Sequence, residues 1–195
     1  MIIFLVFSFL VFCPWFPDFF SSLGIGGIFI PFTGEPLVNP GPGGPSLAFD
    51  AAHEMSHERG WAREDEANFL AFLVLSQSGK ADLEYAADLM GLMYTEQALG
   101  QSGPAGLKAQ KASIKRLSPQ VVRDWNAYVL YWRRFAGPVQ NAAQAVNDSY
   151  LKTQGQKDGV RSYGRMVDLL LTYERALQHP SPGGHPSVLE APKSP

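Results

Sequence analysis

The spacing of apolar residues along the chain predicts a mainly α-helical protein. From residue 46 to about residue 177, apolar positions recur every three to four residues in successive segments, which is the period of helices with one buried face. Residues 21–46 differ, because Gly, Pro and β-branched residues replace that pattern and no helix is expected there. Residues 1–13 differ again, since they are apolar apart from Ser8, as in a membrane segment.

The N-terminal segment, residues 1–20, is predicted to be a membrane anchor. A spanning helix needs about 20 apolar residues, and Pro14, Pro17 and Asp18 interrupt this segment early. It has neither the basic n-region nor the small-residue cleavage site of a secretory signal. A retained anchor is therefore favoured over a signal-like segment or a buried core helix. The first basic residue after it is Arg59, and a flank without positive charge favours a domain outside the cytoplasm.

One short strand is predicted at residues 25–32, followed by an irregular loop over residues 36–45. Pro31 places the strand at a sheet edge, because proline cannot donate to a ladder. An exposed edge strand beside a hydrolytic site can hold an extended peptide by main-chain hydrogen bonds. The alternative is a Gly-rich turn that only packs against the site. The candidate substrate-binding residues are Ile28, Phe29 and Ile30.

The pattern His-Glu-Met-Ser-His at residues 53–57 matches the HExxH motif of zinc-dependent hydrolases. A helix is expected over residues 46–60, with Ser46 as its N-cap and Gly60 as its stop. Residues four apart share a helix face, so His53 and His57 can bind one ion. Glu54 lies about 100° around the helix and can act as the base towards a metal-bound water. The alternative is an amphipathic helix whose histidines face solvent.

The acidic start of a second helix, predicted over residues 61–78, offers the third metal ligand. A catalytic zinc site needs three protein ligands and an open position. The nearest candidates, Glu64 and Glu66, lie about 200° apart around a helix, so only one can face the metal. Glu64 is preferred because Asn68 shares its face, where the amide can hydrogen-bond a ligating histidine. Glu66 is the fallback, and a solvated acidic first turn is the alternative.

Further helices are predicted at residues 80–100, 118–137 and 139–153. The Met and aromatic stripe of the first is expected in the core, and the aromatic stripe of the second is expected in a core or at a membrane interface. A short amphipathic piece between those two helices has basic residues on its polar positions. These residues form a solvated face or contact anionic lipid headgroups. They are Lys108, Lys111, Lys115 and Arg116.

Three polar residues towards the C-terminus are candidate hydrogen-bond donors to the oxyanion of a tetrahedral intermediate. They are Tyr150, Arg161 and Tyr163. Each can equally cap or brace a turn. The tail, residues 178–195, is dense in Pro, Gly and Ser and is predicted to be disordered.

Composition limits both the partners and the possible metal ligands. The formal net charge is -2 and the chain has no run of basic residues, so nucleic acid is not expected as a partner. Cys13 is the only cysteine, which excludes an internal disulfide and a thiolate cluster. A metal must therefore be held by His, Glu or Asp. A length of 195 residues suits one domain.

Three stretches of sequence resemble a known family: GIGGIFIPFTGE with VN just after it, AAHEMSHERGWAREDEANF, and VNDSYLKTQGQKDGVRSYGRMVDLLL. Over residues 24–171 the chain resembles a bacterial family known as a domain of unknown function, whose members look like membrane-anchored HExxH zinc peptidases. The ExxAN element also resembles the helix that supplies the glutamate ligand in glutamate zincins. The resemblance implies that His53, His57 and Glu64 bind zinc and that Glu54 is the base. It also implies a place at the bacterial cytoplasmic membrane.

Together these patterns predict an anchor at residues 1–20, a helical zincin-like domain with a short β element at residues 21–177, and the tail. The predicted function is a membrane-anchored zinc metallopeptidase that hydrolyses peptide or protein substrates through a Zn²⁺-activated water. The alternative is a non-catalytic binding module at the membrane surface with a structural zinc site.

Overall fold

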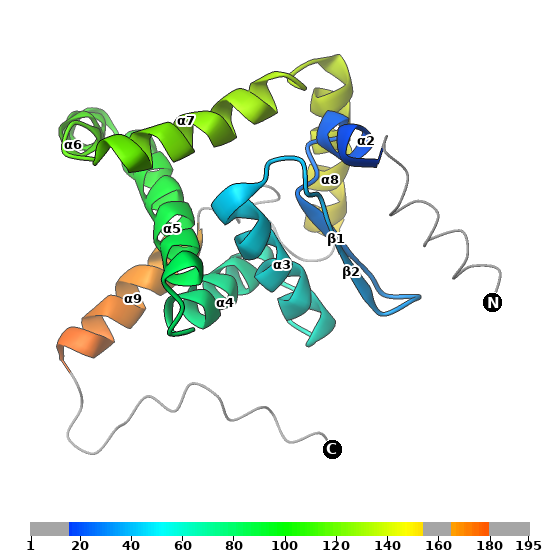
Figure 1. Ribbon diagram of the computed structural model, residues 1–195, viewed down its shortest axis with the longest axis horizontal. Helices are drawn as coiled ribbons and strands as arrows, with labels where there is room; N and C mark the ends of the chain where they lie inside the picture. Colours follow the sequence, from blue (N-terminus) through cyan, green and yellow to red (C-terminus); the bar gives the residue numbers. More distant parts are fainter. Residues whose placement is uncertain (1–15, 154–164, 180–195) are drawn as a thin grey trace.

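Helices make up most of the part of the chain that the computed structural model describes, residues 16–153 and 165–179 (Figure 1). This confirms the mainly helical fold class. The predicted anchor lies mostly outside the described residues, as does nearly all of the tail. Within the described ranges, no helix is both long and apolar enough to cross a membrane. In chain order the elements are α2 (Phe16–Ser22), β1 (Gly27–Ile30), β2 (Glu35–Val38), α3 (Gly44–Glu58), α4 (Glu64–Ser76), α5 (Ala81–Gln101), α6 (Pro104–Ile114), α7 (Pro119–Arg133), α8 (Pro138–Thr153) and α9 (Met166–Gln178).

Strands β1 and β2 form a two-stranded antiparallel hairpin, which corrects the prediction of an irregular loop over residues 36–45. The loop interpretation came from the density of Gly and Pro in this stretch, and the first of these residues, Pro36, is paired with Phe29. The amide of Asn39 donates to the carbonyl of Gly26 at 2.8 Å. Because hydrogen-bonded pairs alternate along an antiparallel ladder, the nitrogen of Pro36 faces away from β1. The proline therefore costs the hairpin no hydrogen bond.

Helix α3 begins two residues earlier than the predicted cap at Ser46. Gly43 has a φ of 61°, and Pro45 occupies the first turn, where proline needs no hydrogen-bond partner. The Ser46 hydroxyl instead lies inside the helix and donates to the Gly43 carbonyl at 2.9 Å. The predicted stop is confirmed, since Gly60 has a φ of 96° and its amide donates to the His57 carbonyl at 3.0 Å.

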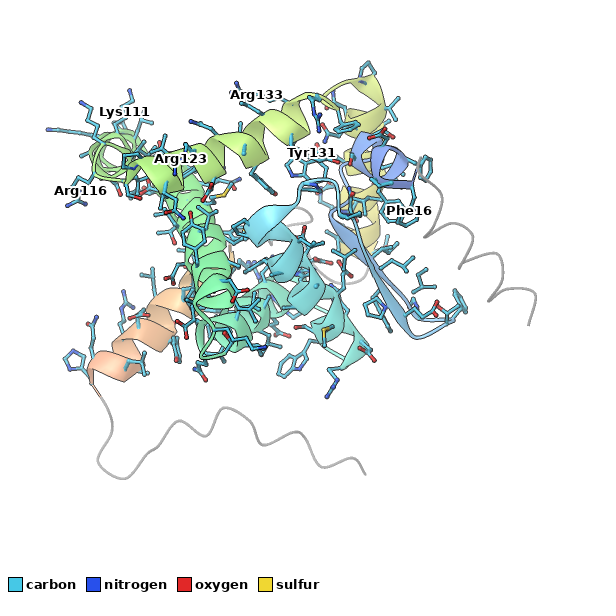
Figure 2. All side chains as sticks on the ribbon, viewed as in Figure 1. Phe16, Lys111, Arg116, Arg123, Tyr131 and Arg133 are labelled. Carbon is cyan, nitrogen blue, oxygen red and sulfur yellow. The ribbon has the colours of Figure 1, made fainter. Side chains whose placement is uncertain are left out.

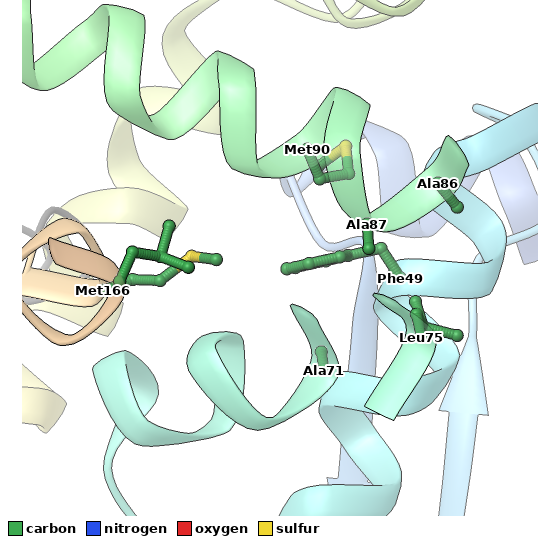
Figure 3. Packing of buried hydrophobic residues seen from close by; sticks show 8 residues of the cluster. Phe49, Ala71, Leu75, Ala86, Ala87, Met90 and Met166 are labelled. Atoms are coloured by element: carbon green, nitrogen blue, oxygen red, sulfur yellow. The ribbon is translucent and has the colours of Figure 1, made fainter. Parts of the chain in front are cut away.

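The core lies where α3, α4, α5 and α9 meet, and Figure 3 shows its side chains at close range. Phe49 from α3 is 1% exposed and packs with small residues and methionines of the other three helices. The expected burial of the Met stripe in α5 is confirmed. Small residues let the helices approach closely, and this fixes α3 relative to α4. The cluster consists of Phe49, Ala71, Leu75, Ala86, Ala87, Met90, Met166 and Leu170.

A buried polar network ties α2 to the hairpin and to α7. The hydroxyl groups of Ser21 and Tyr131 are hydrogen-bonded, and Asn39 Nδ2 donates to Ser21 Oγ at 2.8 Å. Ser21 and Asn39 are both 0% exposed. A Cβ on Gly41 would lie 1.9 Å from Tyr131 Oη, so only glycine fits there. Helix α7 begins as predicted, with the Ser118 hydroxyl accepting from the Val121 amide at 3.3 Å.

Candidate metal centre

The two histidines of the HExxH motif and Glu64 lie together although they come from two helices. His53 and His57 are on the last turns of α3, and Glu64 is the first residue of α4. The reversal at Gly60 connects the helices within a few residues. Ligand atoms of the three side chains lie within 4.8 Å of one another. The structure thus brings together the three residues that were predicted as ligands.

The distances within this group match those expected around one tetrahedral ion. His53 Nε2 is 3.0 Å from His57 Nε2 and 3.2 Å from Glu64 Oε2, and His57 Nε2 is 3.7 Å from Glu64 Oε1. Zinc bonds of about 2.0–2.1 Å in tetrahedral geometry separate neighbouring ligand atoms by about 3.3 Å. An ion can therefore contact all three atoms after only small side-chain movements.

The tautomers of the two histidines give a chemical reason for a cation at this place. His53 Nδ1 is 2.9 Å from Asn68 Oδ1, and His57 Nδ1 is 2.7 Å from the Trp61 carbonyl oxygen. Both of these oxygens accept hydrogen bonds, so both Nδ1 atoms carry the proton when the rings are neutral. Both Nε2 lone pairs then point at each other and at the Glu64 carboxylate. Such a donor set repels itself unless a cation or an extra proton lies between its members.

The fallback ligand, Glu66, lies elsewhere. Its carboxylate is 3.3 Å from Arg63 Nε, and its side chain is more exposed than that of Glu64. Asp65 is buried and also pairs with Arg63, at 2.7 Å. One arginine thus holds two of the three acidic residues of the first turn, and Glu64 alone faces the histidines.

The charges of the group shift the pKa values of its members. Burial raises the pKa of Glu64, but in the metal-free group the hydrogen bonds and charge of the two histidines in their protonated form outweigh it and bring the pKa to about 2. Burial lowers the pKa of His57, whereas the Glu64 carboxylate more than offsets this and leaves it raised. Glu64 is therefore an anion under all ordinary conditions, as a metal ligand must be.

Asn68 orients the ring of His53. It is 2% exposed, and its Oδ1 also accepts from the Tyr94 hydroxyl at 3.4 Å. Its position on the face of Glu64 agrees with the spacing argument made from the sequence. Tyr94 of α5 was not anticipated, because its proximity depends on how α5 packs against α4.

Glu54, the predicted base, is buried between α3 and the hairpin. It is 5% exposed, and its carboxylate accepts a hydrogen bond from the Phe29 backbone. A Cβ on Gly27 would lie 2.6 Å from Glu54 Cγ, so the close approach of β1 requires glycine. Burial raises the pKa of Glu54, the two histidines lower it, and the net shift is upward. The glutamate thus lies against the strand predicted to bind substrate.

Asp50 is a further acidic residue of this region that the sequence reasoning missed. A Cβ on Gly26 would lie 2.8 Å from Asp50 Oδ2, so this carboxylate lies under the hairpin one turn before Glu54. Burial raises the pKa of Asp50 to about 7, with a smaller opposing effect of His53. Its spacing of three and four residues from His53 and Glu54 was a readable signal that it shares their helix face.

The remaining predicted site residues are only partly placed. Ile28, Phe29 and Ile30 form most of β1, and Ile28 is 40% exposed. Tyr150 belongs to α8, but the position of its side chain is not described. Arg161 and Tyr163 lie outside the described residues. The oxyanion-donor prediction therefore stays a prediction.

The fold and the site define a class of protein: a mainly helical chain in which a HExxH helix and an acidic helix converge on a His-His-Glu group. A model of the family described as "Protein of unknown function (DUF3810)" matches residues 14–171, and the chain belongs to that family. The match includes the hairpin, α3 and α4, which are the elements that build the site. No curated protein and no solved structure matches the chain.

Proposed function

We propose that this protein is a zinc-dependent hydrolase, a metallopeptidase that cleaves peptide or protein substrates beside a membrane. The observation that carries the proposal is the convergence of two histidine Nε2 lone pairs and an ionised carboxylate, from His53, His57 and Glu64, next to a buried glutamate. This combination of donors suits zinc, and three protein ligands leave one position open.

Each side chain has a distinct task in this proposal. His53, His57 and Glu64 hold the ion, which when bound supplies Lewis-acid chemistry by polarising a carbonyl and lowering the pKa of water towards ~7. Glu54 accepts the proton of the attacking water and returns it to the leaving amine. Its raised pKa favours that role, because a base works best when its pKa lies near the operating pH.

Strand β1 is the proposed platform for the substrate. The alternation of the ladder turns the main-chain groups of Gly27 and Phe29 away from β2, and the Phe29 amide reaches Glu54. An extended peptide that pairs with this edge is held beside the base by main-chain hydrogen bonds. The exposed side chain of Ile28 offers apolar contact to such a peptide.

A second candidate is a non-catalytic module with a structural metal site. The observation that favours it is the bond between Glu54 and the β1 backbone, which braces the hairpin on α3 whether or not the glutamate ever takes a proton. In that case Glu54 contributes only to the stability of the fold and has no part in catalysis.

The variant Glu54→Gln separates the two candidates. The full chain is purified in detergent micelles, and both its zinc content and its hydrolysis of an unfolded protein substrate are measured. Loss of a general base lowers the rate on the order of 100-fold or more, while the ligands and the zinc are kept. Glu58→Gln is the matched control, because Glu58 is exposed and lies one turn further along α3. Undiminished hydrolysis by Glu54→Gln would exclude the proposed mechanism.

A further inference from the structure

Positive charge is concentrated in one part of the molecule. Residues 104–134 contain seven of the sixteen Lys and Arg residues of the chain but only one of its eighteen Asp and Glu residues. That acidic residue, Asp124, accepts a hydrogen bond from the Tyr85 hydroxyl at 2.6 Å and is partly buried. Four of these seven cations belong to the basic segment noted in the sequence, residues 108–116, and α7 with its C-cap adds the other three.

Helix α7 has two chemically different faces. At 100° per residue, its cations Arg123, Arg133 and Arg134 fall on the same half of the helix as the exposed Val122 and Leu130. The opposite half is aromatic and half-buried, and Tyr131 on it is 9% exposed. The outward half contains no acidic residue. Leu130 is 59% exposed, although a solvated surface helix gains nothing from an apolar side chain there.

Helix α6 repeats this combination of exposed cations and exposed apolar residues. Lys108, Lys111 and Lys115 line a shallow groove together with Leu107. Leu107 is 42% exposed and Ile114 is 39% exposed. Among the described residues, no ion pair involves any cation of α6 or α7. These charges therefore remain available to an external anion, apart from that of Arg134, whose guanidinium lies 4.7 Å from the centre of the Tyr131 ring.

One end of the basic face, the C-terminal end of α7, adjoins the point where the apolar N-terminal residues join the domain, whereas α6 lies at the other end of α7 (Figure 1). Helix α2 directly follows residues 1–15, and Ser21 of α2 is hydrogen-bonded to Tyr131 near the end of α7. Figure 2 shows Phe16 beside this junction, and Lys111 and Arg133 on the side of α6 and α7 that is turned away from α3, α4 and α5. Phe16 is 8% exposed, so α2 is firmly held in this place.

We propose that the outward face of α6 and α7 lies against the anionic surface of a lipid bilayer. Lysine and arginine side chains on an amphipathic helix bind anionic headgroups, while interleaved leucine, isoleucine and valine side chains enter the apolar boundary. A nucleic acid fits this face less well, because the outward half has no aromatic side chains on which bases can stack and its apolar residues would gain nothing.

This arrangement gives the candidate metal centre a defined orientation. The C-terminal end of α3, which bears the histidines, is the end farther from α7 (Figure 1). With α6 and α7 on the bilayer, the His-His-Glu group points away from the lipid. The orientation does not depend on the proposed hydrolase activity, and it can be tested in a protein with an inactive site.

The test measures energy transfer from one dye on the protein to acceptor-labelled lipid. The full chain carries Cys13→Ser and a single new cysteine from Asn126→Cys on the outward half of α7, and it is reconstituted in vesicles of phosphatidylcholine with or without phosphatidylglycerol. We expect higher transfer in the anionic vesicles, and loss of that increase in the variant Lys108→Gln/Lys111→Gln/Lys115→Gln. Salt of about 1 M, where the Debye length is ~3 Å, removes the increase as well.

The matched control neutralises three exposed cations outside this face, in Arg59→Gln/Lys80→Gln/Arg175→Gln, and keeps the increase. Equal transfer in the two kinds of vesicle would overturn the proposal. A binding measurement with duplex DNA offers a second way to overturn the proposal. If the intact chain bound DNA and the three-lysine variant did not, while energy transfer to anionic lipid was the same in both, the face would be assigned to nucleic acid.

Discussion

Asn68 decides the orientation of the first histidine, because its Oδ1 is the acceptor for His53 Nδ1. In Asn68→Ala the ring is free to turn and the proton can move to Nε2, which removes a ligand lone pair. We expect zinc affinity to fall about 10- to 100-fold, measured by competition with a chelator. Asn126→Ala on the exposed side of α7 is the control. Equal affinity in Asn68→Ala would mean that packing alone positions the ring.

Asp50 makes stability depend on pH in a direction opposite to that of most carboxylates. Its pKa in the folded state, about 7, lies above the ordinary value of 3.8, so between these pH values the folded protein binds a proton that the unfolded chain has released. The stability supplied by the neutral carboxyl is complete below about pH 4 and is lost as the pH rises to about 7. Glu54 and His57, whose pKa values are also raised, act in the same direction, while Glu64 acts in the opposite one.

The variant Asp50→Asn isolates this effect in metal-free protein. We expect the variant to gain stability relative to the wild type between pH 4 and pH 7, by on the order of 1–2 kcal/mol, because no charge is buried on deprotonation. Urea unfolding at a series of pH values measures the difference. If the free energy of unfolding changed with pH in the same way in the wild type and in Asp50→Asn, Asp50 would ionise in the folded protein without a cost in stability.

The contact between β1 and α3 holds the proposed base, Glu54, in position. Gly27→Ala would place a Cβ 2.7 Å from Glu54 Oε1, and the strand or the glutamate must then move. We expect hydrolysis to fall sharply and stability to drop by about 1–3 kcal/mol, with the zinc content unchanged. Gly137→Ala is the control, since nothing lies within 4 Å of its added Cβ. Full activity in Gly27→Ala would show that hydrolysis does not need the close approach of β1 to Glu54.

The helices of the site were predictable because their signals are local. The spacing of His53 and His57, the stop at Gly60 and the acidic residues after it all act within a few residues of where they occur. The choice of Glu64 over Glu66 rested on a shared helix face, which also held although the helix begins at Glu64 and not at residue 61.

The hairpin and its contacts were not predictable in the same way. The Gly and Pro residues of 36–45 indicated a loop. The proline at position 36 fits a strand only because the pairing of Gly26 with Asn39 sets a ladder alternation that turns its nitrogen away from β1. The approach of Gly27 to Glu54 joins residues far apart in the chain, and no short-range pattern reports such a contact. The same holds for Tyr94, which reaches Asn68 from α5.

For the whole molecule, the metal is expected to contribute to stability. Without it, two Nε2 lone pairs and a carboxylate converge at the junction of α3 and α4, which are packed on one core. At a free zinc concentration about 1,000 times the dissociation constant, binding adds about 4 kcal/mol to the free energy of unfolding. Thermal unfolding with excess zinc and with EDTA measures this, and magnesium serves as the control ion. Equal melting temperatures in zinc and EDTA would contradict the proposed site.

The central claim is that His53, His57 and Glu64 together hold one zinc ion. Its most direct test compares the zinc content of the purified full chain in two variants, Glu64→Ala and Glu66→Ala. Each removes one glutamate side chain from the first turn of α4. We expect about one zinc per chain in the wild type and in Glu66→Ala, and little or none in Glu64→Ala. Equal zinc in the two variants, or none in the wild type, would contradict it.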